Sequence, residues 1–127
     1  MAEKQTVLSK ADGAPEVEIT IGQAQFGKYE LYLWDAEGLN PQLIGSGLNT
    51  DQVPDIFTID VPTQDLDQML LSWQCLVTAP KPGPGQKFAV STVIRQNGRV
   101  IAPSPYVQSG ALSGTKIVHD YTRFIVR

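Results

Sequence analysis

Residues 69–78 read Met-Leu-Leu-Ser-Trp-Gln-Cys-Leu-Val-Thr, and this stretch alternates between two kinds of side chain. The odd positions are all apolar, whereas the polar Ser72 and Gln74 stand among the even positions. A period of two is typical of a β-strand that buries one face, so we predict such a strand here and place it at the centre of the fold. Leu70 and Leu76 are apolar although they belong to the outward row, and we expect something to cover them.

The rest of the 127-residue chain repeats this pattern in short stretches that turn residues separate. In addition to the central strand, strands are predicted over residues 16–21, 28–35, 42–45, 55–61, 87–96, 99–102 and 115–127. No stretch has the period of a convincing helix. Seven or eight short strands indicate an all-β fold, an antiparallel β-sandwich of the Greek-key or jelly-roll kind. Residues 1–15 are polar and predict a flexible N-terminal arm, followed by a single sandwich domain over residues 16–127.

Asn97-Gly98 separates two strand-like runs and is a strong signal for a two-residue hairpin. The reason is that a type I′ turn needs a positive φ at both of its central residues. This turn predicts that Gln96 lies opposite Arg99. By contrast, residues 45–51 read Gly-Ser-Gly-Leu-Asn-Thr-Asp and are interpreted as a loop.

The last predicted strand changes the parity of its apolar residues. Ile117 and Tyr121 occupy odd positions, whereas Phe124 and Val126 occupy even ones. A bulge between Tyr121 and Phe124, or a strand that passes from one sheet to the other, would account for the change.

The net charge of −3 conceals an asymmetry between the two halves of the chain. Residues 12–67 contain eleven acids and one base, a net −10, whereas residues 68–127 contain seven bases and one acid, a net +6. Strands from the two halves either interleave, so that the charges neutralise one another, or separate into an acidic and a basic side. Separation would let copies of the molecule attract each other. The negative total disfavours nucleic-acid binding.

The sequence contains no recognisable targeting segment and no second cysteine for a disulfide. No apolar run approaches the roughly 18 residues of a membrane span, and residues 1–12 lack the apolar core of a secretory signal peptide. We therefore expect a cytoplasmic protein with no membrane span. Cys75 is the single cysteine, and its place on the inward row of the central strand predicts a buried thiol outside any intrachain disulfide.

The residues that enzymes and metal sites use are sparse. His119 is the only histidine, and Asp120 beside it on a strand points to the opposite face, so the pair cannot serve as the base and orienter of a triad. One His and one Cys argue against a zinc site. Acids in turns, such as Asp35 and Asp55, leave calcium open if their loops gather at one end of the sandwich. We predict no catalytic residues, no metal ligands, no cofactor and no enzyme.

Glu30, Tyr32 and Trp34 form the outward row of the strand predicted over residues 28–35. Two aromatic rings beside a carboxylate suit a sugar, because the ring stacks on the aromatic face and the carboxylate accepts its hydroxyl groups. These three residues are therefore the predicted ligand-binding residues. The alternative is that a second sheet, the N-terminal arm or a partner subunit covers them.

Two functions follow from these observations. The first is a non-enzymatic interaction or structural protein that acts through self-association or through a protein partner, and a homo-oligomer is expected. The second is a small lectin-like module that binds a glycan through Glu30, Tyr32 and Trp34, possibly assisted by calcium.

Overall fold

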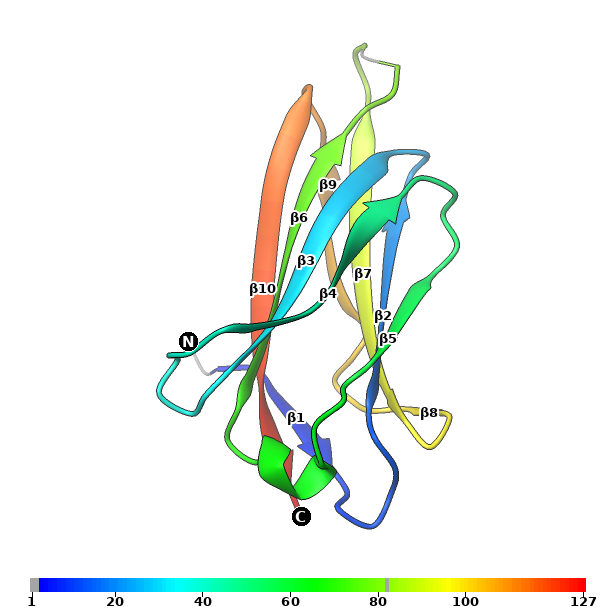
Figure 1. The fold of residues 1–127 in the computed structure, drawn as a ribbon. Helices are drawn as coiled ribbons and strands as arrows, with labels where there is room; N and C mark the ends of the chain where they lie inside the picture. Colours follow the sequence, from blue (N-terminus) through cyan, green and yellow to red (C-terminus); the bar gives the residue numbers. More distant parts are fainter. Residues whose placement is uncertain (1–2, 82) are drawn as a thin grey trace.

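The strand predicted at the centre of the fold is β6 (Leu70–Thr78), the middle strand of one of two sheets. The computed structural model, which describes residues 3–81 and 83–127, shows the two sheets packed face to face (Figure 1). Sheet A has the strand order β1 (Gln5–Leu8), β10 (Thr115–Val126), β6, β3 (Phe26–Trp34) and β4 (Gln42–Asn49). Because β10 and β3 flank β6, the predicted central position is confirmed.

Sheet B completes the sandwich. Its strand order is β5 (Asp55–Thr58), β2 (Glu16–Gly22), β7 (Lys87–Gln96) and β8 (Arg99–Val100), and β9 (Tyr106–Ala111) follows β8 along the same edge of β7. One turn of 3-10 helix, η1 (Thr63–Leu66), precedes β6. The predicted all-β sandwich is confirmed, and the described residues form ten strands in place of the predicted seven or eight. Across residues 3–81 and 83–127, no helix is long and apolar enough to cross a membrane.

The segment predicted as a flexible arm contains β1, which pairs in parallel with the end of β10. Thr6 and Leu8 alternate with exposed residues and are buried. The Thr6 hydroxyl lies 2.7 Å from the hydroxyl of Tyr106 and 2.8 Å from that of Thr122. An apolar contact and a small polar network therefore hold this segment against the sandwich.

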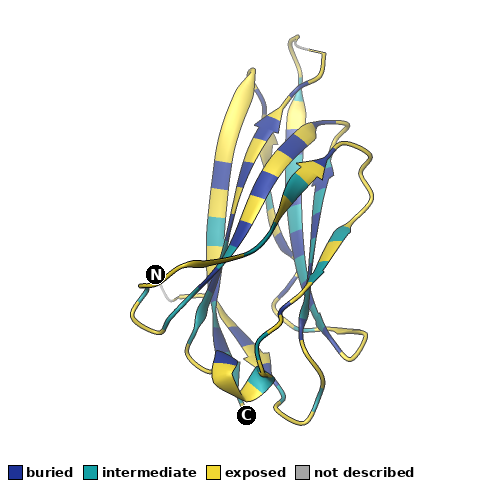
Figure 2. Cartoon of the chain, viewed as in Figure 1, coloured by how far each residue is buried: buried dark blue, intermediate teal, exposed yellow. Residues whose placement is uncertain are grey.

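The core lies between the two sheets and follows the alternation of the sequence. Buried residues alternate with more exposed ones along β3 and β6 (Figure 2). The largest fully buried apolar side chains come from both sheets, from η1 and from the segment after β5: Leu8, Ile19, Ile21, Leu31, Leu33, Ile59, Leu66, Leu71, Trp73, Ile94 and Phe124. Each buried residue of this size contributes roughly 1.5–3 kcal/mol through burial of apolar surface.

Strand β4 corrects the prediction of a loop over residues 45–51, because the strand continues through most of that range. A Cβ atom on Gly45 would lie 2.5 Å from the ring of Phe57, and one on Gly47 would lie 2.6 Å from the hydroxyl oxygen of Tyr29. The glycines therefore serve close packing of β4 over two aromatic side chains, which a turn-based interpretation misses.

Strand β10 is regular, so the predicted bulge or sheet crossing is wrong. Its pairing with β6 runs without a break from Thr115 to Arg123. Val118 and Phe124 face the core on even positions, whereas Ile117 and Tyr121 are exposed on odd positions. The parity of the apolar residues changes because some of them lie on the outer face of the sheet.

The hairpin between β7 and β8 is confirmed. Asn97 and Gly98 have φ values of 54° and 76°, and Gln96 pairs with Arg99.

The strands of the acidic and basic halves of the chain occupy different sides of the sandwich. Strands β2 to β5 lie together at one end of both sheets, with β4 in contact with β5, and β6 to β10 make up the other side. Segments outside these strands do mix, because η1 and Asp67 lie against β10 and Asp12 pairs with Arg99. Within sheet B, the boundary is crossed by an ion pair between Arg95 and Glu18 at 2.8 Å.

Candidate functional site on the outer face of sheet A

The outer face of sheet A is formed by four adjacent strands, β4, β3, β6 and β10, whose residues pair in register. Five rows of side chains cross this face from β4 to β10. The first is Leu48, Lys28, Leu76 and Ile117; then come Ser46, Glu30, Gln74 and His119; Leu43, Tyr32, Ser72 and Tyr121; Trp34, Leu70 and Arg123; and, on the other side of the first, Phe26, Thr78 and Thr115, the last two rows without a member from β4. We call the first of these the apolar row. The register thus joins residues that are far apart in the sequence into one surface.

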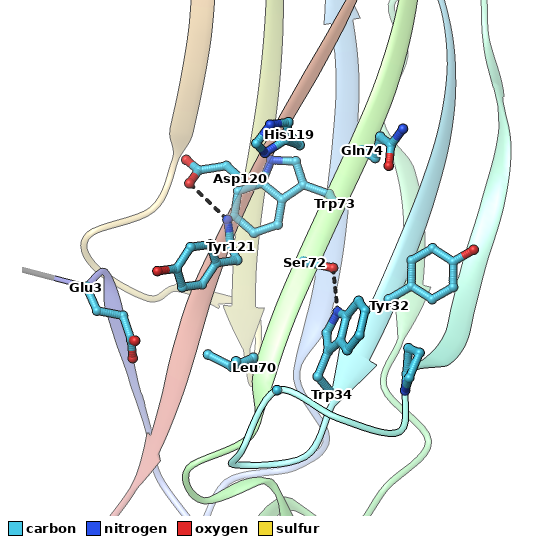
Figure 3. Close-up of a pocket in the computed structure, with 12 residues that line it drawn as sticks. Glu3, Tyr32, Trp34, Leu70, Ser72, Trp73, Gln74, His119, Asp120 and Tyr121 are labelled. Carbon is cyan, nitrogen blue, oxygen red and sulfur yellow. Dashed lines mark hydrogen bonds between the residues drawn. The ribbon is translucent and has the colours of Figure 1, made fainter.

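An open groove of about 700 Å³ occupies the lower part of this face. Side chains from three strands line it: Tyr32 and Trp34 of β3, Leu70, Ser72 and Gln74 of β6, and His119 and Tyr121 of β10 (Figure 3). We call it the aromatic groove. Its volume lies within the usual range for small-ligand sites.

The aromatic side chains of β3 are held in place by hydrogen bonds. The indole N–H of Trp34 donates to the Ser72 hydroxyl at 2.8 Å, and the Tyr32 hydroxyl donates to the Glu30 carboxylate at 2.6 Å. The bond to Glu30 raises the pKa of Tyr32. The two rings lie 6.2 Å apart at 50° to one another, so they line the groove as two inclined surfaces and not as one flat platform.

The structure therefore brings all three predicted ligand-binding residues to one face. Tyr32 and Trp34 line the aromatic groove, whereas Glu30 lies beside it and accepts the Tyr32 hydroxyl. Their role in binding stays a prediction.

The residues that β6 and β10 contribute were missed as site residues. Ser72 and Gln74 belong to the outward row of the central strand, and Tyr121 belongs to the odd row of the last strand, so the alternation places each on an outer face. The missing information is the order of the strands, since β10 and β3 become neighbours of β6 only in the folded sheet.

One wall of the groove carries a rigid turn. The Asp35 carboxylate accepts the backbone N–H of Leu39 at 2.8 Å, that of Glu37 at 3.1 Å, and the side-chain amide of Asn40 at 2.8 Å. These hydrogen bonds, led by that from Leu39, lower the pKa of Asp35. The turn between β3 and β4 is thereby fixed, and its Pro41 lines the groove.

The other wall is held by Arg123 of β10. Its guanidinium donates to the carbonyl oxygens of Ala36 and Gln68 at 3.0 and 2.6 Å and forms an ion pair with Glu3, another lining residue. The hydrogen bond to Glu3 raises the pKa of Arg123. The groove is therefore bounded on both sides by satisfied polar groups.

The other residues considered for catalysis or metal binding lie apart or are engaged in other contacts. Asp120 points away from His119 and pairs with the Lys4 ammonium at 2.6 Å. Cys75 is fully buried, and burial raises its pKa to about 12. Asp55 accepts the hydroxyl of Tyr29 at 2.7 Å. In the part of the chain that the structure describes, no three His, Cys, Asp or Glu residues lie close enough together to hold a metal ion.

Comparison with known proteins yields one distant likeness. No family model matches the chain, and no curated protein matches it. Among solved structures, the chain is similar to a DUF4425 family protein from Bacteroides ovatus, with 9% sequence identity, 87% of this chain and 94% of that chain covered, and a TM-score of 0.49. This likeness is too weak to support an inference about function.

Proposed function

We propose that this chain is a non-enzymatic interaction protein that associates with another protein through the outer face of sheet A. The observation that supports the proposal is the exposure of apolar side chains on four adjacent strands. Leu48, Ile117 and Leu43 are 62%, 57% and 52% exposed, and Leu76 and Tyr121 are also exposed. Soluble proteins rarely expose a contiguous apolar surface of this extent unless it is an interaction site.

The few charged groups on this face leave its apolar character largely intact. Glu30 is engaged by Tyr32, and Arg123 is engaged by Glu3 and two carbonyl groups. Lys28 takes part in none of the ion pairs among the described residues. A partner that covers this face therefore has to accommodate one free ammonium group.

The aromatic groove suits the centre of such an interface. Trp and Tyr are the residues most enriched among those that dominate binding energy, because each buries a large surface with few rotatable bonds. Trp34 and Tyr32 are, in addition, held in place by Ser72 and Glu30 before any partner arrives. Such pre-organisation lowers the entropic cost of association.

Site-specific photo-crosslinking tests this proposal. A photoreactive amino acid in place of Leu76 lies on the outer face of sheet A, whereas the same replacement of Val107, on sheet B, is the control. We expect a covalent adduct with a protein from position 76 and none from position 107, with both proteins retaining cooperative melting. Equal or absent adducts at the two positions would rule out a role for this face.

A glycan ligand is the second candidate, and the aromatic groove supports it. The polar atoms of Trp34 and Tyr32 are already hydrogen-bonded, so their ring faces remain free for stacking. Gln74 and His119 supply further polar groups along the same groove. A glycan array should then give a signal that Trp34→Ala abolishes while the melting temperature changes little. A signal that survives this substitution would exclude the groove as the glycan site.

A further inference from the structure

We infer that the partner of sheet A is a second copy of this chain, related by a two-fold axis that runs nearly along the strands between β3 and β6. This inference rests on the proposed function and adds the identity and geometry of the partner. Four observations lead to it: the register of the rows, the composition of the strands on the two sides of the axis, the separation of charge and the area of the face.

A two-fold axis along the strands exchanges strands but keeps each row in place. Strand β3 then lies over β6 of the second copy, and β4 lies over its β10. In the apolar row, Leu48 faces Ile117 of the second copy, and Lys28 faces Leu76. The aliphatic part of Lys28 can lie on Leu76 while its ammonium reaches water at the side.

The other rows match in the same way. Leu43 faces Tyr121 of the second copy, and Trp34 faces Leu70. In the one polar row, Glu30 faces Gln74, an amide that can donate to the carboxylate. Three contacts, Leu48 with Ile117, Leu43 with Tyr121 and Trp34 with Leu70, therefore join apolar or aromatic side chains, whereas Lys28 faces Leu76 and Tyr32 faces Ser72. Each contact occurs twice, as a two-fold interface requires.

A two-fold axis across the strands gives a poorer match. It reverses the order of the rows, so that, for an axis midway between the first two rows, the apolar row lies on the polar row of the second copy. Leu48 then faces Ser46, and Leu76 faces Gln74. Both axes keep the strands of the two copies within the roughly 30° that packed sheets show, so the match between the rows is what distinguishes them.

The charge distribution favours the same arrangement. The axis lies between β3 and β6, which is also the boundary between the acidic strands β2 to β5 and the basic strands β6 to β10. Rotation about it places the acidic side of each copy opposite the basic side of the other. Strands β2 to β5 carry a net −3 and strands β6 to β10 a net +4, with β3, β4 and β6 themselves neutral, so the attraction between the two copies in this orientation is modest.

The area of the face is sufficient for a specific dimer. Four strands that each occupy about 4.8 Å of width, and the eight residue steps of about 3.3 Å along β3 from Phe26 to Trp34, cover roughly 19 by 26 Å, or about 500 Å² on each copy. The total of about 1,000 Å² reaches the lower bound for a biological interface. An association of moderate strength is therefore expected.

Complementary charge substitutions test the pairing of Leu48 with Ile117. Leu48→Asp and Ile117→Lys each place an unpaired charge in the proposed interface, so each should raise the dissociation constant of the dimer at least about 100-fold. An equimolar mixture of the two variants should form a heterodimer, because the new carboxylate faces the new ammonium at one contact and the native pair remains at the other. Light scattering and native mass spectrometry distinguish the 13.9 kDa monomer from the dimer.

The control mixture contains Leu48→Asp with Val107→Lys, whose charge lies on sheet B, so the carboxylate at position 48 stays unpaired. This mixture should form clearly less heterodimer than the mixture of Leu48→Asp with Ile117→Lys. Both positions on sheet A are exposed, so the variants should fold; if one melts early, Leu48→Ser and Ile117→Ser replace it and should each weaken the dimer about tenfold. A wild-type chain that stays monomeric at 100 μM, or a dimer that the mixture fails to restore, overturns this inference. An adduct from position 76 with a different protein would then still support the proposed function.

Discussion

The outer faces of the two sheets differ although both sheets obey the same alternation. On sheet B, the central strands β2 and β7 present mainly polar side chains, Glu16, Glu18, Thr20, Ser91 and Arg95 beside Val93, and the exposed apolar Ile56, Val100 and Val107 stand on the outer strands. On sheet A, the central strands β3 and β6 themselves present Tyr32, Trp34, Leu70 and Leu76 beside the polar Lys28, Glu30, Ser72 and Gln74. The inner faces are mainly apolar because the fold requires a dry core, with a few buried polar residues such as Thr6, Thr92 and Thr122, whereas the outer faces are free to differ. The outer face that departs from the solvated pattern is therefore where a function is best sought.

The largest expected effect concerns Cys75, whose side chain lies on the inner face of β6, away from water. Burial raises the pKa of Cys75 from 9.0 to about 12, so the folded state keeps the thiol neutral. The contribution of this neutral thiol to the free energy of unfolding is complete below pH 9. It declines by about 1.4 kcal/mol for each pH unit between pH 9 and 12, because only the thiol of the unfolded chain ionises there. Cys75→Ala should remove this part of the decline in urea unfolding measured from pH 8 to pH 11.

Tyr29 adds to the same decline above pH 10, since burial and its hydrogen bond to Asp55 raise its pKa. An identical pH dependence in the wild type and in Cys75→Ala would show that the thiol is already hydrated in the folded state.

The second effect compares the two outer faces directly. Ile117 on sheet A and Val107 on sheet B are both 57% exposed. Ile117→Asp should weaken self-association at least about 100-fold, or about 3 kcal/mol, whereas Val107→Asp should leave it unchanged. Sedimentation equilibrium of the two variants provides the measurement. If both substitutions dissociate the protein equally, the contrast between the faces has no functional meaning.

The third effect concerns the aromatic groove. Ser72→Ala removes the acceptor of the Trp34 indole N–H. It should lower the free energy of unfolding by about 1 kcal/mol, because water replaces part of the lost hydrogen bond. Ser91→Ala on sheet B is the matched control and should cost less. Unfolding in urea measures both, and tryptophan fluorescence should shift to the red only in Ser72→Ala. Equal costs for the two serines would mean that Trp34 is not held by Ser72.

The smallest effect concerns the polar face of sheet B. Glu18→Gln removes the ion pair with Arg95. It should lower the free energy of unfolding by less than about 1 kcal/mol, because solvent screens a partly exposed pair. The cost should shrink further in 1 M NaCl, and self-association should not change. A larger, salt-independent cost would indicate that sheet B also depends on specific contacts across its outer face.

Much of this architecture could be predicted from the alternation of side chains. The two faces of β3 and β6 and the Asn97-Gly98 hairpin follow from local physics, because a strand has a period of two and a type I′ turn needs two positive φ angles. The same reasoning placed Tyr32 and Trp34 on an outer face.

The errors share a different physical origin. Gly45 and Gly47 were interpreted as a loop because their close approach to Phe57 and Tyr29 depends on contacts between distant parts of the chain. The apolar residues of β10 suggested a bulge because outward and inward apolar residues look alike in a sequence. The aromatic groove combines three strands, and only the order of strands within the sheet, which no local pattern encodes, brings Tyr121 to the same groove as Trp34.

The buried thiol of Cys75 can also report how often the sandwich opens locally. Gln74 and Leu76, its neighbours along β6, both belong to the outer face of sheet A, while the thiol itself lies between the sheets. A thiol reagent reaches it only when the sandwich opens locally, so the rate of its modification reports the frequency of opening. Any partner that binds the closed sandwich through this face lowers that frequency. The rate of thiol modification therefore measures the occupancy of a surface that the reagent never touches.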